Sequence, residues 1–121
     1  MLDDGLLGIN GASESKLFEN AVFNALYRKE EVELAYYSDQ SMEVDFVVSA
    51  KGAVRALIQA SYDISDFTTK ERELKALVST SNKLKCKNLY VVTLNSAGVE
   101  YYKGKKIVVL PLWKFMLNKS L

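Results

Sequence analysis

Three side chains carry oxygen atoms that can bind a metal and lie in segments that a folded chain can bring together: Glu19, Asp45 and Gln59. Two carboxylates and an amide oxygen can hold Mg²⁺, which takes oxygen ligands and keeps several waters. Such a metal activates water and stabilises the charge that develops during phosphodiester hydrolysis. The chain has no histidine, which excludes histidine-based general-base triads and histidine-ligated zinc and leaves carboxylates, lysine, tyrosine and serine for chemistry.

Asp45 lies in an apolar run, residues 42–48, which turns at residues 49–52 and returns as residues 54–62. This pattern predicts a β-hairpin, and a carboxylate within it predicts a partner, because desolvating a charge is costly. Strict alternation divides the hairpin into faces. On the first strand we expect one face to carry Glu43, Asp45 and Val47 and the opposite face to carry Val44, Phe46 and Val48. On the returning strand we expect one face to carry Leu57, Gln59 and Ser61 and the opposite face to carry Ala56, Ile58 and Ala60. We therefore expect Asp45 and Gln59 side by side at one end of the sheet.

Glu19 falls in a segment with the spacing of an amphipathic helix, from about Ser15 to Lys29. The apolar stripe consists of Phe18, Ala21, Val22, Ala25 and Leu26. Glu19 stands at the edge of this stripe, so its carboxylate can point into a groove. The alternative is a solvated helix glutamate, which is the more common situation for this residue type.

The remaining elements follow from local patterns. The pattern predicts strands at residues 34–37, 88–94, 99–102 and 107–110, the last of them ended by Pro111. It predicts a short helix at residues 112–117, which Trp113 packs onto the sheet. A capping box, Thr68-x-x-Glu71, opens another helix. Its buried stripe is Leu74, Leu77, Val78 and Leu84. This order predicts an α/β domain, a mixed sheet flanked by helices, over residues 14–121, with residues 1–13 as a linker or N-terminal loop.

Composition narrows the functional classes. A chain of 121 residues forms one domain, and its net charge of +1 exerts no global pull on nucleic acid or membranes. The single cysteine, Cys86, rules out an internal disulfide and fits a reducing compartment. Because no apolar run reaches the roughly 20 residues of a membrane span and the first residues lack a basic signal region, we expect a cytoplasmic protein.

The motifs at residues 17–22, 43–48 and 57–62 together resemble the PD-(D/E)XK nuclease superfamily, with its restriction-endonuclease-like fold. More narrowly, they resemble the C-terminal domain of archaeal-type AAA+ ATPases of unknown function, a likeness that includes Arg72-Glu73 and spans residues 8–115. The resemblance implies an acidic residue on the first helix, an aspartate on the second strand and an E-x-K on the third as site residues. It also implies an ATPase domain N-terminal to Met1.

The chain departs from that family at the third motif, where E-x-K is replaced by Gln59-Ala60-Ser61. Gln59 offers an oxygen without a charge, and Ser61 cannot replace the lysine that positions and activates water. Lys70 or Arg72 is an alternative source of a cation, although charges in a first helical turn are usually solvated. The predicted site is therefore degenerate: Glu19, Asp45 and Gln59 as catalytic and metal positions, Ser61 in place of lysine, and either no cofactor or weakly bound Mg²⁺.

Three functions fit these observations, and we predict the first, with the other two as alternatives. The first is a degenerate nuclease-fold module that binds nucleic acid or another partner for an attached ATPase. The second is an active Mg²⁺-dependent DNA nuclease with a relocated lysine, and the third is a structural assembly module, for which a homo-oligomer is one form. Tyrosine pairs 36–37 and 101–102 suit base stacking, and lysine groups 83–87 and 103–106 suit phosphate contacts. We favour the simpler interpretation, in which the tyrosines are ordinary strand residues and the lysines are solvated.

Overall fold

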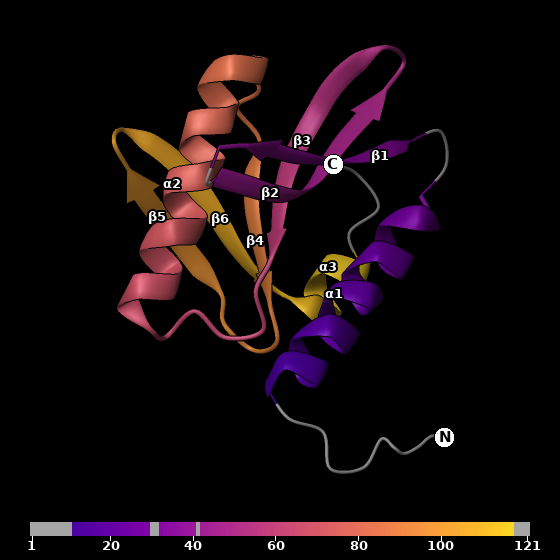
Figure 1. Ribbon diagram of the computed structural model, residues 1–121. Coiled ribbons are helices and arrows are strands. Elements are labelled where there is room, and N and C mark those ends of the chain that lie inside the picture. Colours follow the sequence, from indigo (N-terminus) through magenta and orange to yellow (C-terminus); the bar gives the residue numbers. More distant parts are fainter. Residues whose placement is uncertain (1–10, 30–31, 41, 118–121) are drawn as a thin grey trace.

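The computed structural model describes residues 11–29, 32–40 and 42–117, and its elements follow the predicted order (Figure 1). They are α1 (Gly11–Tyr27), β1 (Glu33–Asp39), β2 (Met42–Ala50), β3 (Ala53–Ala60), α2 (Phe67–Leu84), β4 (Leu89–Thr93), β5 (Gly98–Tyr102), β6 (Lys105–Pro111) and α3 (Leu112–Leu117). The first helix starts at Gly11, four residues before the predicted Ser15. The remainder of the predicted linker, residues 1–10, lies outside the described residues.

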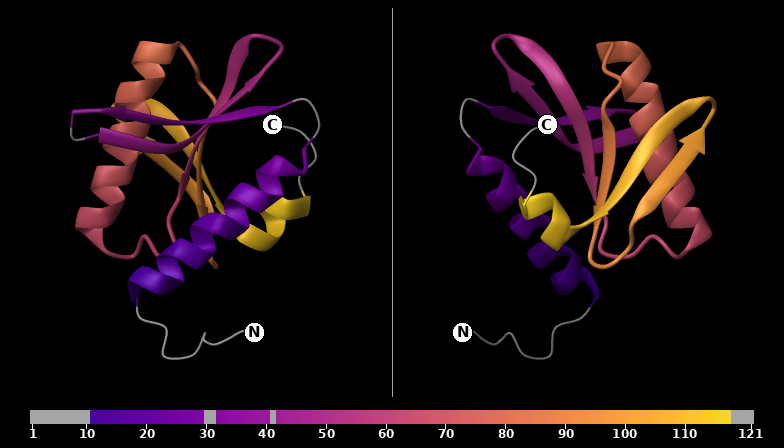
Figure 2. Two further views of the ribbon diagram at one scale, coloured as in Figure 1. Left: turned by 45° about the vertical axis from the view of Figure 1, so that its right-hand side comes forward. Right: turned by 180° about the vertical axis from the view of Figure 1, so that it is seen from behind.

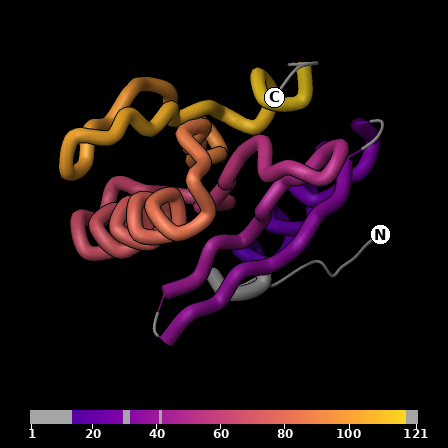
Figure 3. Tube along the Cα trace, turned by 90° about the horizontal axis from the view of Figure 1, so that it is seen from above, coloured from indigo at the N-terminus to yellow at the C-terminus, as the bar shows by residue number. Residues whose placement is uncertain are grey.

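The six strands form one mixed sheet in the order β1-β2-β3-β4-β6-β5. Strand β4 is parallel to both β3 and β6, and the other neighbours are antiparallel. Helix α2 covers one face, whereas α1 and α3 lie against the other (Figure 2). Seen from above, the sheet is strongly twisted and α2 lies between its β1–β2 and β5–β6 ends (Figure 3). The predicted α/β class with a mixed sheet is confirmed.

Each face of the sheet has its own hydrophobic core. Leu74, Leu77 and Val78 of α2 pack on the first face, as the helical spacing predicted. Phe18, Val22 and Leu26 of α1 pack on the second. The α3 helix joins this second core through Phe115, which is fully buried, while Trp113 is 62% exposed. The prediction that Trp113 anchors the terminal helix is wrong, because the short helix directs Phe115 inward instead.

Alternation along β2 is broken by a β-bulge, so the predicted faces of this strand are wrong. Val44 and Val47 both belong to the core under α2, whereas Phe46 and Val48 belong to the core under α1. The cause is a register shift against β1, where Ala35 pairs with Val47 but Tyr37 pairs with Val44. One additional residue of β2 therefore falls between the two pairs, next to Asp45. On β3, the predicted set Ala56, Ile58 and Ala60 is confirmed.

The predicted capping box of α2 is also wrong. Asp66 is the N-cap residue, and its Oδ2 accepts a hydrogen bond of 2.8 Å from the backbone N–H of Thr69. Thr68 lies inside the helix, and Glu71 accepts a hydrogen bond from the Tyr102 hydroxyl on β5 at 3.2 Å. Because Asp66 lies three residues before Thr69, its side chain accepts the hydrogen bond from a first-turn backbone N–H, and the Thr68 side chain is not needed for this.

Candidate carboxylate site

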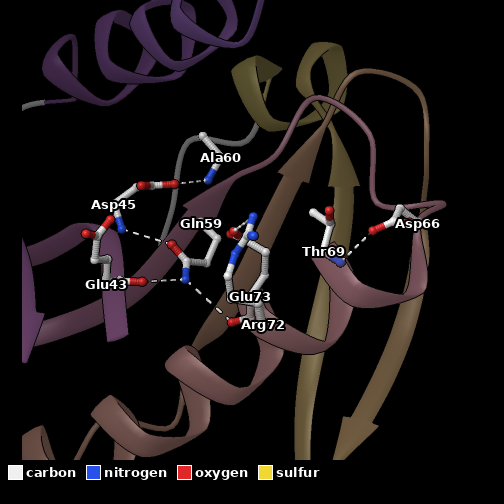
Figure 4. Close-up of polar contacts among 8 residues, drawn as sticks. All are labelled: Glu43, Asp45, Gln59, Ala60, Asp66, Thr69, Arg72 and Glu73. Carbon is white, nitrogen blue, oxygen red and sulfur yellow. Dashed lines mark hydrogen bonds and ion pairs between the residues drawn. The ribbon is translucent and has the colours of Figure 1, made fainter. Parts of the chain in front are cut away.

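The site lies where β2 and β3 separate beyond their last paired residues, Phe46 and Ile58. At this point side chains replace the backbone ladder (Figure 4). The Oε1 atom of Gln59 accepts a 2.9 Å hydrogen bond from the N–H of Asp45, and its Nε2 donates to the carbonyl of Glu43 at 2.9 Å. In return, Oδ2 of Asp45 accepts a 2.8 Å hydrogen bond from the N–H of Ala60. The bulge thus leaves backbone groups unpaired, and two polar side chains satisfy them.

The predicted neighbourhood of Asp45 and Gln59 is therefore confirmed. Gln59 is only 1% exposed, and both ends of its carboxamide are hydrogen-bonded to the backbone of β2. Its Nε2 also lies 3.5 Å from the Glu73 carbonyl of α2, which is a long contact. The carboxamide holds the open end of the hairpin in register with α2, and its role as a metal ligand stays a prediction.

A pocket of about 690 Å³ opens between this end of the hairpin and the first turns of α2. Its lining consists of Met42, Glu43, Asp45, Gln59, Phe67, Thr68, Glu71, Arg72, Glu73, Lys75 and Ala76. Four carboxylates and two cationic side chains belong to this lining. The excess of carboxylates suits a cation or a cationic side chain better than a phosphate group.

Two of these carboxyl groups have unusual proton affinities. Burial raises the pKa of Asp45 to about 6, with the charges of Glu19 and Glu43 adding to it and the hydrogen bond from Ala60 opposing it. Burial also raises the pKa of Glu73 to about 7, helped by the nearby charge of Asp45. Both groups therefore take up protons near neutral pH, because their charged forms are poorly solvated and repel each other.

Glu73 is the residue of this site that the sequence reasoning missed. Its side chain is 16% exposed, and its Oε1 is buried without a hydrogen-bond partner. Its Oε2 lies 3.6 Å from Nη2 of Arg72, whose side chain is largely exposed. The available sign was its position four residues before Leu77, which places it on the buried face of α2.

The other predicted site residues have distinct positions. Glu19 is half-buried on α1, and its charge raises the pKa of both Asp45 and Glu73, so α1, β2 and α2 contribute to one electrostatic cluster. Ser61 is buried just beyond β3, where its N–H donates a 2.9 Å hydrogen bond to the Val92 carbonyl. Within the described ranges, no group of three acidic or cysteine side chains is arranged to hold a metal ion.

The two proposed replacements for the missing lysine point to different places. Lys70 pairs with Glu100 of β5 at 3.1 Å and lines a separate cavity of about 190 Å³. Arg72 remains beside Glu73 at the carboxylate pocket. Of these two cations, Arg72 is therefore the one that belongs to the site.

Comparison with known proteins finds one family whose model matches this chain. The family model described as "Domain of unknown function (DUF4143)" matches residues 14–115, which include every residue of the site. No curated protein matches the chain. Among the helices of the described segments, none is both long and apolar enough to cross a bilayer.

Proposed function

Because this chain belongs to the family Domain of unknown function (DUF4143), we propose a role for it from its own site chemistry. The chain acts as a non-catalytic binding module with a restriction-endonuclease-like sheet, attached to the C-terminal side of an AAA+ ATPase domain. It binds nucleic acid or a partner protein for that ATPase and does not cleave phosphodiester bonds.

The observation that carries this proposal is the use of Gln59 and Asp45 as backbone ligands. A nuclease of the resembled superfamily presents a carboxylate and a lysine here. In this chain the carboxamide of Gln59 is buried between Asp45 N–H and the Glu43 carbonyl, and Ser61 is buried as well. Groups engaged in holding two strands together are poorly suited to change partners for a metal and a water during turnover.

The raised pKa values support the same role. A metal requires deprotonated carboxylates, so Mg²⁺ would compete with protons at Asp45 and Glu73 near pH 6 to 7. Mg²⁺ also requires a nearly ideal octahedral arrangement of ligands, whereas a cationic side chain of a partner protein fits this pocket without one. The ATPase assignment is supported by the resemblance around Arg72-Glu73.

A second candidate, the Mg²⁺-dependent nuclease, is favoured by one observation. Oε1 of Glu73 is buried without a partner beside Asp45, and Glu19 adds a third carboxylate to the cluster. A cation would relieve the repulsion among these groups, and Arg72 would then supply the positive charge that the family takes from lysine.

A cleavage assay separates these candidates. The 121-residue chain is incubated with single-stranded, duplex and branched DNA in Mg²⁺ or Mn²⁺, beside Asp45→Asn and the matched surface variant Asn20→Ala. We expect intact DNA in every lane. Metal-dependent cleavage that Asp45→Asn abolishes and Asn20→Ala retains would replace the binding role with the nuclease. If no DNA form binds at low salt either, and light scattering shows a homo-oligomer, the assembly module takes precedence.

A further inference from the structure

One part of the sheet surface is not covered by the described helices. Figure 2, right, shows the sheet from behind, with α1 and α3 to one side and β6 and β5 in front of α2. On this surface Val99 is 47% exposed and Tyr101 is 71% exposed. An exposed apolar sheet face of this kind requires a reason, because soluble domains normally cover theirs.

Contacts on the opposite face establish which side chains point here. Glu100 and Tyr102 of β5 reach α2, through Lys70 and Glu71 respectively, so Val99 and Tyr101 point away from α2. On β6 and β4, Ile107, Val109 and Val91 belong to the core under α2. Lys106, Val108 and Tyr90 alternate with them and therefore lie on the opposite face, where Lys106 is exposed, Val108 is half-buried and Tyr90 is half-buried against the core under α1. Register aligns Tyr90, Val108 and Val99 in one row and Lys106 with Tyr101 in the next.

Lysines from two distant segments lie toward one end of the sheet, with the ammonium of Lys103 over the ring of Tyr102. Because β4 and β6 are parallel, both begin at the same end of the sheet, where β5 finishes. Lys87 precedes β4, Lys103 occupies the β5–β6 turn, and Lys106 is at the start of β6, all of them exposed. The sole acidic residue of β4, β5 and β6 is Glu100, which faces α2 and pairs with Lys70. The face is thus aromatic at its centre and positive at its margin.

We propose that this surface, named here the β5–β6 face and formed by Tyr90, Val99, Tyr101, Lys106 and Val108 with Lys87 and Lys103 at its margin, binds single-stranded nucleic acid. The exposed Tyr101 ring offers a stacking platform to an unpaired base, the half-buried Tyr90 ring offers a smaller one, and the lysines contact phosphates. Tyr90 and Tyr101 stand two strands and one row apart, about 12 Å from the standard sheet spacings, a span that a short stretch of single strand bridges. A duplex keeps its bases stacked on each other and offers these rings no free face.

This assignment rests on the proposed function in one respect: both take nucleic acid as the ligand. The β5–β6 face lies on the other side of the sheet from the carboxylate pocket, where the excess of acidic side chains repels phosphate. The two sites can therefore be tested separately with substitutions in each.

The test is fluorescence anisotropy of the 121-residue chain with labelled oligo-dT and oligo-U of about 12 nucleotides, and with a duplex of equal length. We expect one or both single strands to bind at least about tenfold more tightly than the duplex. Between about 50 and about 200 mM salt, log K should fall with a slope of about −2, as expected for three lysine–phosphate contacts. The oligonucleotide that binds more tightly distinguishes DNA from RNA as the ligand.

Variants identify the surface. Tyr101→Ala should weaken binding by about tenfold or more, while Tyr101→Phe, which keeps the stacking ring, retains it. Lys106→Ala should reduce the salt slope by about 0.7. The matched controls are Tyr36→Ala, an exposed tyrosine on the other edge strand, and Lys16→Ala on α1, both expected to bind normally.

Equal losses from Tyr101→Ala and Tyr36→Ala, tighter binding of the duplex, or no binding at about 50 mM salt would each overturn the assignment. Cleavage of DNA in Mg²⁺ would overturn the proposed non-catalytic role and leave the β5–β6 face standing. Conversely, loss of oligonucleotide binding in Asp45→Asn, with Tyr101→Ala unaffected, would move the binding site to the carboxylate pocket.

Discussion

At the scale of single residues, the position that distinguishes this chain from the nucleases it resembles is Gln59. A carboxamide has a donor and an acceptor, which is what the unpaired N–H of Asp45 and carbonyl of Glu43 require. A carboxylate at this position would have no donor unless it were protonated. The glutamine is therefore suited to joining the two hairpin strands next to the bulge, and its removal should lower the free energy of unfolding.

Gln59→Ala should lower the free energy of unfolding by about 3 kcal/mol, because two backbone groups lose their partners and a cavity forms. Urea denaturation followed by circular dichroism measures this change. The exposed α1 variant Asn20→Ala is the control and should differ little from the parent chain. A Gln59→Ala variant as stable as that control would show that water replaces the carboxamide without cost.

Gln59→Glu, which introduces the acidic residue of the resembled E-x-K motif, should be tolerated at pH 5 and strongly destabilising at pH 8. The introduced carboxyl is buried beside Asp45 and Glu73, so its folded-state pKa rises and its stability contribution is lost as the pH rises through that value. Denaturation midpoints at the two pH values, compared with those of Gln59→Ala, measure the effect. Equal cost at both values would mean that the new carboxyl is solvated.

Stability of the parent chain should also fall between pH 5 and pH 8. The folded pKa values of Asp45, about 6, and Glu73, about 7, exceed their ordinary values of 3.8 and 4.5. The folded state therefore holds more protons than the unfolded chain in this window, and raising the pH favours unfolding, by on the order of 2 kcal/mol. Glu73→Gln should flatten this dependence, which urea titrations across the window would reveal; an unchanged slope would assign it to other groups.

At the scale of elements, the first turns of α2 form one wall of the carboxylate pocket. The Asp66 carboxylate caps this helix, and its hydrogen bond with the N–H of Thr69 holds the pKa of Asp66 below its usual value. The same turns present Arg72 and Glu73 to the pocket. Fraying of this end would therefore disturb the site.

Asp66→Ala should lower the melting temperature by a few degrees, whereas Thr68→Ala should leave it nearly unchanged. The reason is that Asp66 satisfies the N–H of Thr69 and Thr68 is an ordinary first-turn residue. Thermal denaturation above pH 6 measures both, since the cap requires an ionised carboxylate. A larger loss from Thr68→Ala would reinstate the capping box that local sequence suggests.

At the scale of the whole molecule, two cores share one sheet, and α3 is integral to the second. Phe115→Ala should cost about 3–5 kcal/mol in a single unfolding transition, because Phe115 is fully buried against α1 and the sheet. The matched variant Trp113→Ala removes a larger but exposed ring and should cost far less. Urea denaturation monitored at far-ultraviolet wavelengths tests both, and a two-step transition for Phe115→Ala would show that α3 folds independently.

Much of this architecture was predictable because its causes are local. The stripe of Leu74, Leu77 and Val78 predicted α2 and its buried face, and the neighbourhood of Asp45 and Gln59 followed from hairpin pairing. The bulge at Asp45 was not predictable, because it depends on how β1 aligns with β2. Trp113 and Phe115 could not be distinguished either, since both are large and aromatic and only the direction of a short helix separates them.

The sequence by itself determined the order of elements, the α/β class and the presence of Gln59-Ala60-Ser61 where the resembled nucleases have E-x-K, since hydrophobic periodicity, turn residues and residue identity are properties of short segments. The tertiary structure alone decided that Gln59 replaces a backbone ladder, that Glu73 joins Asp45 in one buried carboxylate pocket, and that β4 and β6, with Lys87 and Lys106 near their starts, begin at the same end of the sheet. These features join residues 14 or more positions apart, and their positions depend on strand register and helix packing, which no local pattern encodes.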